Sequence, residues 1–379
     1  MNSEVLIIGG GVIGLSIARE IHRNGITQIT ILERGKIGQE SSYAAAGMLA
    51  PNAETGEAGI FTDFCTESLS LYAQFAENLF AETGVDIELD RHGTLFLSFT
   101  EKDSAELLHR YEWQKKAGLK VEHLSAQETR KSEPFVSPDV RESLFFPNDW
   151  QVENRKLLHA LRKYAELNGI EIREDAEIKN ILSENGKVVG AETENEKFLA
   201  ENVVLATGAW TSFIKAENLQ MPVVKPIRGQ MIAFQTAKRL FEKVIYSSRG
   251  YLVPRADGRI LIGATVEDAG FDKNIYDLST EILREAAIEI APSLGNLQIY
   301  ENWAGLRPFA NNGLPIIGNL PHAENLFIAT AHYRNGILLA PLTAKIIAEK
   351  LAANRNSEYL EFFRPQQARS NDLSLNISI

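Results

Sequence analysis

The sequence predicts an α/β protein in which a domain with a parallel sheet is interleaved with a second domain on a mixed or antiparallel sheet. The chain opens with a strand, a helix and a second strand, the unit from which parallel sheets are built. Further buried-type strands occur at residues 203–206 and 325–329. Between them, residues 223–262 change to short strands separated by turns. Parallel-sheet units therefore alternate with a strand-rich segment.

The opening unit has clear boundaries. Residues 5–8 are a short apolar run next to glycines, which is typical of a buried parallel strand. Isoleucines then recur at helical spacing over residues 13–21, and the Asn-Gly pair at 24–25 is expected to end this helix. Residues 29–32 are apolar or β-branched and form the second predicted strand.

The rest of the chain is assigned from the same periodicities. Helices are expected at residues 64–83, 102–117, 157–168, 279–290 and 336–351. Strands are expected at residues 94–99, 170–172, 187–192, 203–206, 231–234, 251–253, 260–262 and 325–329. The polar tail that begins at residue 353 is expected to be loosely held.

These elements predict two discontinuous domains. The parallel-sheet domain comprises residues 1–86, 151–222 and 303–355. The mixed-sheet domain comprises residues 87–150 and 223–302, and residues 356–379 form a C-terminal tail. No internal repeat or low-complexity block is found along the chain.

Composition excludes several classes of function. The 379 residues are 44% hydrophobic and 23% charged, as in ordinary globular proteins. With 39 Lys and Arg against 50 Asp and Glu, the net charge of −11 disfavours nucleic acid as a partner. Cys65 is the only cysteine, so an internal disulfide and cysteine-based zinc sites are excluded, and no metal site is predicted.

Targeting features are also missing from the sequence. The N-terminus is acidic, whereas a secretory signal would begin with basic residues and continue into a longer apolar core. No stretch reaches the roughly 18 consecutive apolar residues expected of a membrane-spanning helix. We therefore expect a cytoplasmic enzyme without a membrane span, and the sequence leaves a homo-oligomer open.

Residues 9–14, GGGVIG, match the G-x-G-x-x-G pattern of Rossmann-like dinucleotide-binding loops between a strand and a helix. Gly9 allows the tight turn, Gly11 lets a pyrophosphate approach the backbone, and Gly14 lets the helix pack closely on the strand. Glu33 ends the second strand and would accept hydrogen bonds from a ribose diol, which disfavours NADP. A glycine-rich turn without ligand is the alternative.

Residues 41–48, the loop beyond Glu33, are mostly small or hydroxylic and would let a flat ring system lie against the backbone. These residues alone do not separate NAD from FAD. A second G-x-G-x-x-G pattern is absent from the sequence, which disfavours reductases with separate FAD and NAD(P)H domains.

Several further motifs follow the loop in a fixed order. They read E at 33, SS at 41–42, AAGML at 45–49, ATGAW at 206–210, RGQ at 228–230, YLVPR at 251–255, WAGLRP at 303–308 and RNGILLAP at 334–341. Together with the glycine loop they resemble the FAD-dependent amine oxidases of the D-amino-acid oxidase superfamily. Within it the likeness is strongest to the glycine oxidase family, whose members supply iminoglycine for thiamine biosynthesis. The resemblance covers residues 4–350.

This resemblance implies FAD as the cofactor, with the parallel-sheet domain as its site and the mixed-sheet domain as the substrate domain. The implied cofactor-binding residues are Gly9, Gly11, Val12, Ile13, Gly14, Glu33, Arg34, Ser41, Ser42, Ala46, Gly47, Met48, Ile178, Arg334, Asn335, Gly336, Ile337, Leu338, Leu339 and Ala340. Gly336 opens a predicted helix, whose N-terminal dipole would stabilise negative charge on the reduced flavin. Related sarcosine oxidases hold flavin through a late cysteine that this sequence lacks, so the FAD is expected to be non-covalent.

Two residues are the catalytic candidates, Arg307 and Tyr251. Arg307 lies in an apolar context and is suited to a bidentate clamp on the substrate carboxylate, with a structural ion pair as the alternative. Tyr251 could donate a hydrogen bond to the same carboxylate, with a core tyrosine as the alternative. Arg334 is expected to contact flavin, substrate or both.

Arg249 and His332 have less certain roles. On a regular strand Arg249 would face the same side as Tyr251 and could bind a second anionic group at the substrate entrance, unless Gly250 bulges. No protein base is required if the substrate amine arrives neutral, so His332 is expected to be a structural hydrogen-bonding residue.

The expected reaction is the oxidative deamination of a small amino acid such as glycine, sarcosine or a similar amine. A hydride would leave Cα for FAD N5, and oxygen would reoxidise the flavin, giving imine or 2-oxo acid, ammonia and hydrogen peroxide. One alternative is an amino- or imino-acid dehydrogenase that uses a quinone or protein acceptor. Another is a non-catalytic dinucleotide-binding module. The small-molecule substrate and oxygen are the expected partners, and a homo-oligomer stays open.

Overall fold

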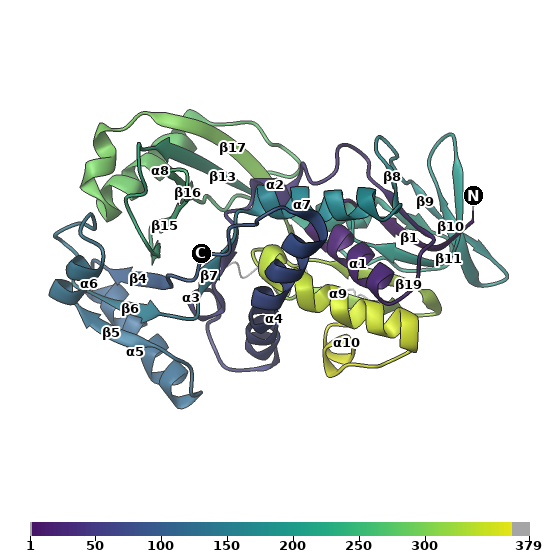
Figure 1. Ribbon diagram of the computed structural model, residues 1–379, viewed down its shortest axis with the longest axis horizontal. Coiled ribbons are helices and arrows are strands. Elements are labelled where there is room, and N and C mark those ends of the chain that lie inside the picture. The colour runs from purple at the N-terminus through teal and green to yellow at the C-terminus, as the bar shows by residue number, and fades with distance from the viewer. Residues whose placement is uncertain (1, 366–379) are drawn as a thin grey trace.

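Two large β-sheets form the protein, and helices lie beside and between them (Figure 1). The structure is a computed structural model that describes residues 2–365. The part of the expected C-terminal tail from residue 366 onward lies outside the described residues. The α/β class predicted from the sequence is confirmed.

The first sheet has nine strands and carries the opening βαβ unit. Five of its strands run parallel in the order β8, β2, β1, β11, β19, and β1 pairs with β2 on one side and β11 on the other. Its members are β1 (Asn2–Ile8), β2 (Ile29–Leu32), β8 (Glu171–Arg173), β9 (Asn180–Glu184), β10 (Lys187–Glu192), β11 (Lys197–Leu205), β12 (Lys215–Ala216), β18 (Ile316–Leu320) and β19 (Ala323–Thr330).

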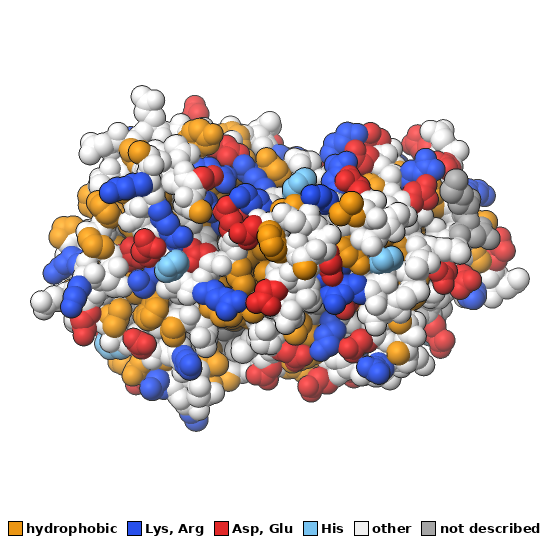
Figure 2. Space-filling model, viewed as in Figure 1, with side chains coloured by type: hydrophobic (Ala, Val, Ile, Leu, Met, Phe, Trp, Pro, Cys, Tyr) orange, Lys and Arg blue, Asp and Glu red, His pale blue; other side chains and the backbone are white. Residues whose placement is uncertain are grey.

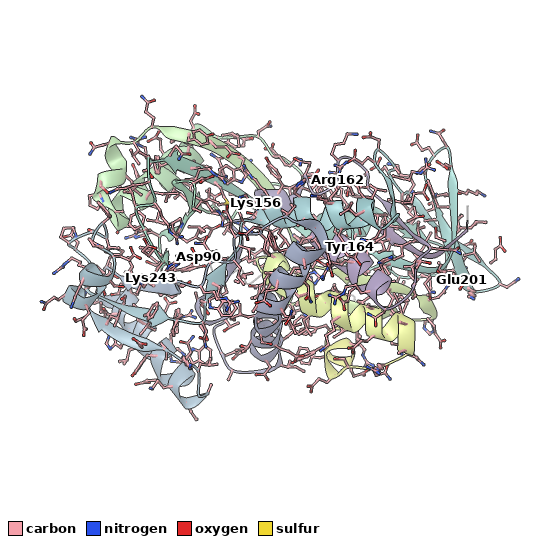
Figure 3. All side chains as sticks on the ribbon, viewed as in Figure 1. Asp90, Lys156, Arg162, Tyr164, Glu201 and Lys243 are labelled. Carbon is pink, nitrogen blue, oxygen red and sulfur yellow. The ribbon has the colours of Figure 1, made fainter. Side chains whose placement is uncertain are left out.

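Helices cover one face of this sheet, and their apolar sides form the largest core. The core-forming helices are α1 (Val12–Arg23), α4 (Ile60–Thr83), α7 (Asn154–Leu167) and α9 (Gly336–Ala353). The hydroxyl of Tyr164 in α7 lies 2.9 Å from Nδ1 of His22 in α1, which ties these two helices together (Figure 3). Cys65 is fully buried within this core.

The second sheet has eight strands in the order β17, β13, β16, β15, β14, β4, β6, β5. All neighbours are antiparallel except β14 and β4. Its members are β4 (Thr94–Ser98), β5 (Glu122–Ser125), β6 (Glu142–Phe146), β13 (Lys225–Gln235), β14 (Val244–Ser247), β15 (Gly250–Pro254), β16 (Arg259–Gly263) and β17 (Ile299–Phe309).

The two faces of this sheet have different neighbours because side chains alternate along a strand. Ile232, Phe234 and Leu252 face α8 (Asp277–Ile290) and form one core with it. Met231 and Tyr251 point the other way and pack with Ala46 in the loop that follows β2. The second face therefore looks toward the glycine-loop region of the first sheet.

Short elements complete the chain between the sheets. They are α2 (Ser41–Ala44), β3 (Met48–Leu49), α3 (Pro51–Glu54), α5 (Glu101–Lys116), α6 (Ala126–Ser132), β7 (Trp150–Gln151), η1 (Gly208–Phe213), η2 (Pro292–Asn296) and α10 (Glu358–Phe362). β3 pairs with β7 in a two-stranded sheet that lies between the large sheets in Figure 1.

The structure differs from the sequence-based expectations at several elements. Strands β5, β6, β9, β14, β17 and β18 were not expected from the periodicity. The expected domain boundary at residues 302/303 falls inside β17, which pairs with β13 on both sides of this boundary. The expectation of a loosely held tail is wrong for α10, because Tyr359, Leu360 and Phe363 are buried in the main core.

The surface carries both signs of charge. Figure 2 shows acidic and basic side chains interspersed over the visible face, without a single large basic area. Among residues 2–365, no helix combines the length and apolar character that crossing a bilayer requires.

Candidate active site

The glycine loop joins β1 to α1 at a point where side chains do not fit. Gly9 has φ +112°, and a Cβ there would lie 2.3 Å from the carbonyl oxygen of Ala206 in the turn after β11. A Cβ on Gly14 would lie 1.9 Å from the carbonyl oxygen of Gly9. Both glycines are therefore required by the close packing of α1 on the strands, which is the task that the sequence pattern predicts for them.

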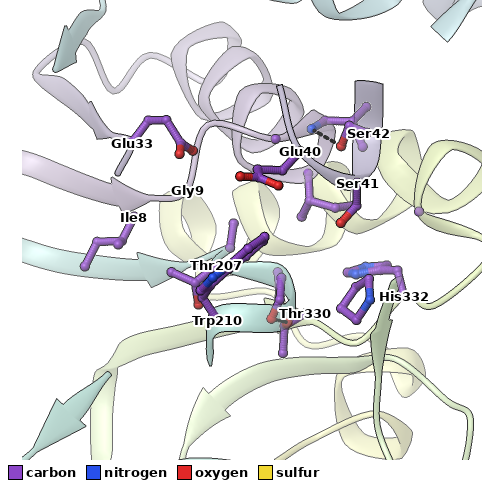
Figure 4. Close-up of a pocket in the computed structure, with 18 of the residues that line it drawn as sticks. Ile8, Gly9, Glu33, Glu40, Ser41, Ser42, Thr207, Trp210, Thr330 and His332 are labelled. Atoms are coloured by element: carbon purple, nitrogen blue, oxygen red, sulfur yellow. Dashed lines mark hydrogen bonds between the residues drawn. The ribbon is translucent and has the colours of Figure 1, made fainter. Parts of the chain in front are cut away.

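Glu33 is fixed by main-chain groups next to this loop. Its carboxylate accepts hydrogen bonds from the amides of Gly10 at 2.9 Å and Gly35 at 3.0 Å. The side chain is buried and lies at the wall of a cavity (Figure 4). Each carboxylate oxygen has a second acceptor position, so Glu33 can still bind a ribose hydroxyl.

A cavity lies along the carboxyl ends of the parallel strands. Residues at or just after the ends of four strands line it: Ile8, Leu32, Ala206 and Thr330. Ligands of open α/β sheets bind at this edge. Of the predicted cofactor-binding residues, it is lined by Gly9, Gly11, Val12, Ile13, Glu33, Arg34, Ser41, Ser42, Ile178, Arg334, Gly336 and Ile337.

The remaining predicted cofactor residues are placed differently. Ala46, Gly47, Met48 and Asn335 line a second, adjoining cavity. Gly14 faces the strand rather than the cavity, as its packing role requires. The side chains of residues 338–340 are buried in the core below the first turn of α9, so only main-chain groups of these residues could face a ligand.

Two helix N-termini point at the first cavity. Gly11 precedes α1 and Gly336 begins α9, and both line the cavity wall. The hydroxyl oxygen of Ser42 already accepts from the amide of Val12 at 3.0 Å (Figure 4). Amides of an opening helical turn lack intrahelical partners and favour anionic ligands.

Sequence reasoning missed several residues that line the outer wall of the first cavity. The guanidinium carbon of Arg34 lies 3.8 Å from the ring centre of Trp210, and Arg34 also pairs with Glu40. Trp210 and Thr207 belong to the ATGAW motif at 206–210, whose position after a buried strand was the available signal (Figure 4).

The second cavity shares Ser41, Ala45, Tyr333, Arg334 and Ile337 with the first. It lies between the loop after β2 and the face of the eight-stranded sheet that carries Tyr251 and Arg307. The structure thus brings together Tyr251, Arg307 and Arg334, three of the four predicted substrate-binding residues.

Arg307 is positioned by the strand pair β13–β17. Its Nη1 donates to the carbonyl oxygens of Thr265 at 3.0 Å and Arg228 at 3.3 Å. A Cβ on Gly229, which lies on the neighbouring strand, would come within 2.3 Å of Nη2, so the guanidinium occupies the space that this glycine leaves open. Two carbonyls and one glycine therefore fix the plane of the guanidinium at the cavity wall.

Tyr251 lies beside this arginine on β15. Burial raises the pKa of its hydroxyl above the ordinary value, although the positive charges of Arg307 and Arg334 oppose that shift. The hydroxyl is therefore protonated at neutral pH and can act as a hydrogen-bond donor. Met231 lies next to it, with Sδ 3.8 Å from the hydroxyl oxygen.

Arg334 is paired with an acid that the sequence reasoning missed. Its Nε lies 3.0 Å and its Nη2 3.1 Å from the two carboxylate oxygens of Glu54. The Glu54 carboxylate raises the pKa of Arg334 further above its usual range, and burial opposes this effect. Tyr246 also donates to Glu54, at 2.9 Å, and contacts Arg334.

The expectation for Arg249 is wrong in its geometry. Arg249 lies in the turn between β14 and β15, half-exposed, with Nε 3.4 Å from a carboxylate oxygen of Glu289 in α8. It lines neither of the two cavities described above. The reason is Gly250, whose φ of +152° breaks the regular alternation that would have placed Arg249 beside Tyr251.

His332 is buried at the wall of the first cavity. Its Nε2 lies 3.1 Å from the hydroxyl oxygen of Thr343, a contact that the expected role of a structural hydrogen-bonding residue requires. Burial lowers its pKa to about 3, so the ring is neutral at physiological pH. Within residues 2–365 no group of three or more His, Cys, Asp or Glu side chains is arranged to hold a metal ion.

These features fit an FAD molecule that spans both cavities. The first cavity offers a glycine cradle, the N-terminus of α1 and the Glu33 carboxylate, which suit pyrophosphate and ribose. The second offers small residues, Ala44 to Gly47, against which a flat ring can lie. Gly336, at the start of α9, lines the first cavity, so the dipole of this helix faces the same ligand.

Comparison with known proteins gives the same assignment. Residues 4–350 match the family described as FAD dependent oxidoreductase, DAO. Glycine oxidase from Pseudomonas aeruginosa is 32% identical over 354 residues, which cover 93% of this chain and 95% of that protein. The bifunctional protein ThiO/ThiG from Synechocystis sp. is 36% identical over 371 residues, 96% of this chain but 54% of that protein.

Solved structures agree with these sequence comparisons. The crystal structure of glycine oxidase from Geobacillus kaustophilus superposes with a TM-score of 0.91 at 30% identity, covering 97% of this chain and 100% of that chain. L-proline dehydrogenase from P. horikoshii shares the fold, with a TM-score of 0.85 at 22% identity and 96% of each chain covered. The chain therefore belongs to the FAD-dependent oxidoreductase (DAO) family and is an oxidoreductase of the glycine oxidase type.

Proposed function

We propose that this protein oxidises a small amino acid, glycine, sarcosine or a similar amine, to an imine that hydrolyses to a 2-oxo acid, with oxygen as acceptor and hydrogen peroxide as product. One observation carries the proposal. The second cavity, which adjoins the first, is lined by Arg307, Tyr251 and Arg334, groups that suit the carboxylate of an amino acid.

Arg307 and Tyr251 would bind and orient the substrate. Main-chain carbonyls hold Nη1 of Arg307, so its remaining donors can meet a carboxylate without rearrangement. The protonated hydroxyl of Tyr251 would donate to the same carboxylate. A carboxylate fixed at these two groups would leave the α-carbon and the amine in the part of the cavity lined by residues 44–47.

Small residues limit the size of this substrate. Ala44, Ala45, Gly229 and Gly305 line the cavity, and a Cβ on Gly305 would lie 2.5 Å from the Cβ of Ala44. The two walls are therefore in close contact at this point, which favours substrates with little or no side chain.

The residues also explain how the reaction can proceed without a protein base. When bound, FAD accepts a hydride from the α-carbon of the substrate. His332 is neutral, but its Nε2 is engaged with Thr343. Glu54 is paired with Arg334 and Tyr246. A substrate that enters with a neutral amine needs no proton removed by these groups before hydride leaves.

The ThiO/ThiG relatives support a role in thiamine biosynthesis, for which the imine would be the product passed on. A dehydrogenase that uses a quinone or protein acceptor is the second candidate. A cytoplasmic location stays a prediction from the sequence.

An anaerobic amine screen tests the proposal. Purified flavin-loaded protein should lose its flavin absorbance with glycine or sarcosine, and subsequent aeration should restore it with one peroxide formed per flavin reduced. Bleaching without rapid reoxidation by oxygen would favour a dehydrogenase. Flavin that no amino acid or amine bleaches would contradict the proposed activity and support a non-catalytic module.

A further inference from the structure

The second cavity, in which we propose that the substrate binds and which is called the substrate cavity below, has both positive and negative side chains in its walls. Three charged side chains line it, namely Arg307, Arg334 and Glu54, and its other lining residues are uncharged. The cavity therefore has one net positive charge. A small amino acid with a neutral amine has one negative charge, so the two are matched when one carboxylate binds.

Glu54 accounts for this balance because it neutralises Arg334 directly. Both of its carboxylate oxygens lie within 3.1 Å of that guanidinium, at Nε and Nη2. Tyr246 donates a further hydrogen bond to Glu54 at 2.9 Å. The Nε and Nη2 donors of Arg334 are thus occupied by groups of the protein itself, which leaves only Nη1 for a ligand.

The backbone that carries Glu54 is held in place by the anchoring of α3. At the start of α3, Asp149 accepts from the amides of Asn52 at 3.2 Å and Ala53 at 2.9 Å. At its end, Nη1 of Arg110 donates to the carbonyl oxygens of Asn52 at 3.0 Å and Thr55 at 2.6 Å. The backbone position of Glu54 is therefore fixed, and its carboxylate is held by Arg334 and Tyr246.

We propose that Glu54 is a specificity-determining residue that restricts the cavity to amines carrying a single carboxylate. A second anionic group would meet the Glu54 carboxylate and would find Arg334 already paired. Arg249, which the sequence suggested for binding such a group at the entrance, is paired with Glu289 elsewhere. This inference rests on the proposed function, because it specifies the charge of the amine that the protein is proposed to oxidise.

The test compares two amines that differ by one carboxylate, sarcosine and iminodiacetate. The Glu54→Gln variant keeps the size of the side chain and one acceptor oxygen for Arg334, but it raises the net charge of the cavity to two. We expect the ratio of kcat/KM for iminodiacetate over sarcosine to rise at least about tenfold relative to wild type, since each tenfold step is about 1.4 kcal/mol of differential binding.

Two control variants separate a local effect from a general one. Glu54→Asp keeps the charge and should keep the wild-type preference for sarcosine. Glu57→Gln removes an exposed negative charge three residues away, outside the cavity lining, and should leave the ratio unchanged. An equal rise in Glu57→Gln would contradict a specific role for Glu54.

Binding of unreactive anions provides a readout that does not depend on turnover. In the wild-type holoenzyme, acetate should perturb the flavin spectrum at a concentration at least about tenfold lower than malonate, and Glu54→Gln should reduce this gap. Malonate binding as tightly as acetate to wild type would overturn the inference even if the variant did not fold. If wild type oxidises no amine at all, the proposed function fails, whereas an unchanged sarcosine-to-iminodiacetate ratio refutes only the role of Glu54.

Discussion

Contacts with its neighbours fix the orientation of the Arg307 guanidinium at the wall of the second cavity. Its Nη1 is held by two carbonyl oxygens, and the absence of a side chain at Gly229 leaves space for Nη2. An arginine held this way loses little additional side-chain entropy when it binds a carboxylate. Its contribution to binding should therefore be large and specific to the guanidinium shape.

Replacing this guanidinium should impair substrate binding severely. Removing one partner of a buried, hydrogen-bonded charge pair costs about 2–5 kcal/mol. We therefore expect Arg307→Ala to lower kcat/KM for the best amine by roughly 10²- to 10³-fold, and Arg307→Lys to recover only part of the loss. Steady-state peroxide assays measure this effect. Unchanged flavin content would show that the cofactor site is intact, and wild-type kcat/KM in Arg307→Ala would exclude the proposed clamp.

The burial of His332 makes a prediction about pH. Its pKa is lowered from 6.5 to about 3, so below pH 6.5 the unfolded chain takes up a proton that the folded protein does not. Stability should therefore fall as the pH drops from 6.5 toward 3, by about 1.4 kcal/mol for each pH unit well inside this window.

Denaturant unfolding of wild type and His332→Gln between pH 4.5 and pH 7.5 measures this effect. Glutamine can still bond to Thr343 but does not titrate, so the variant should show a shallower loss of stability on the acid side. The exposed His109→Gln serves as the matched control and should behave as wild type does. Parallel profiles for all three proteins would show that His332 is not the source of the acid sensitivity.

At the scale of elements, the shape of the eight-stranded sheet's surface at the second cavity depends on which residues of β13 and β17 lie opposite each other. Gly229 lies opposite Gly305 in this antiparallel pair, and Arg307 is two residues further along the same face. Two facing glycines leave a gap in the surface of the sheet. The loop at Ala44 fills one side of it and the guanidinium of Arg307 the other.

Filling this gap should displace the arginine. In Gly229→Ala the added methyl group would lie 2.3 Å from Nη2 of Arg307, so the guanidinium must move. We expect kcat/KM to fall by at least about tenfold, with a stability loss of about 1–3 kcal/mol from overpacking. Gly56→Ala is the control, because a Cβ there meets no atom within 4 Å. Kinetics and thermal unfolding together test this, and equal effects of the two substitutions would contradict the packing argument.

At the scale of the whole molecule, the two sheets meet around the loop that lines both cavities. Arg255, at the end of β15, donates from Nη2 to the carbonyl oxygen of Ala46 at 2.8 Å and from Nη1 to that of Val152 at 2.7 Å. This buried arginine thereby links the second sheet to the loop beside the cofactor site. A ligand that occupies both cavities would add further contacts between the sheets.

Bound FAD should therefore stabilise the protein, and it should be released on denaturation. Cys65, the only cysteine, is buried in the helical core, and burial raises the pKa of its thiol. We expect acid precipitation to leave yellow flavin in the supernatant, and Tm to rise on adding FAD to apoprotein. At a free FAD concentration 100 times Kd, the stabilisation should be about 2.7 kcal/mol. Flavin that stays with the precipitate would indicate a covalent link.

Local signals in the sequence were sufficient for much of the first sheet. The glycine spacing, the apolar run at residues 5–8 and the acid at Glu33 act through contacts close along the chain, and the structure contains each element they predict. The short strands were harder to predict from the sequence. β5 and β6 carry Glu122 and Glu142, and β18 has only five residues, so their pairing depends on neighbours far away in the sequence.

The sequence alone therefore determined the α/β class and the glycine cradle, because steric limits on glycine and the periodicity of buried residues act locally. Its motifs determined the resemblance that implied the cofactor. Only the tertiary structure decided which charges share the substrate cavity. Glu54 and Arg334 are 280 residues apart in the sequence and meet at 3.1 Å, whereas Arg249 is two residues from Tyr251 and faces elsewhere. Electrostatic pairing depends on distance in space, and the packing of the two sheets sets that distance.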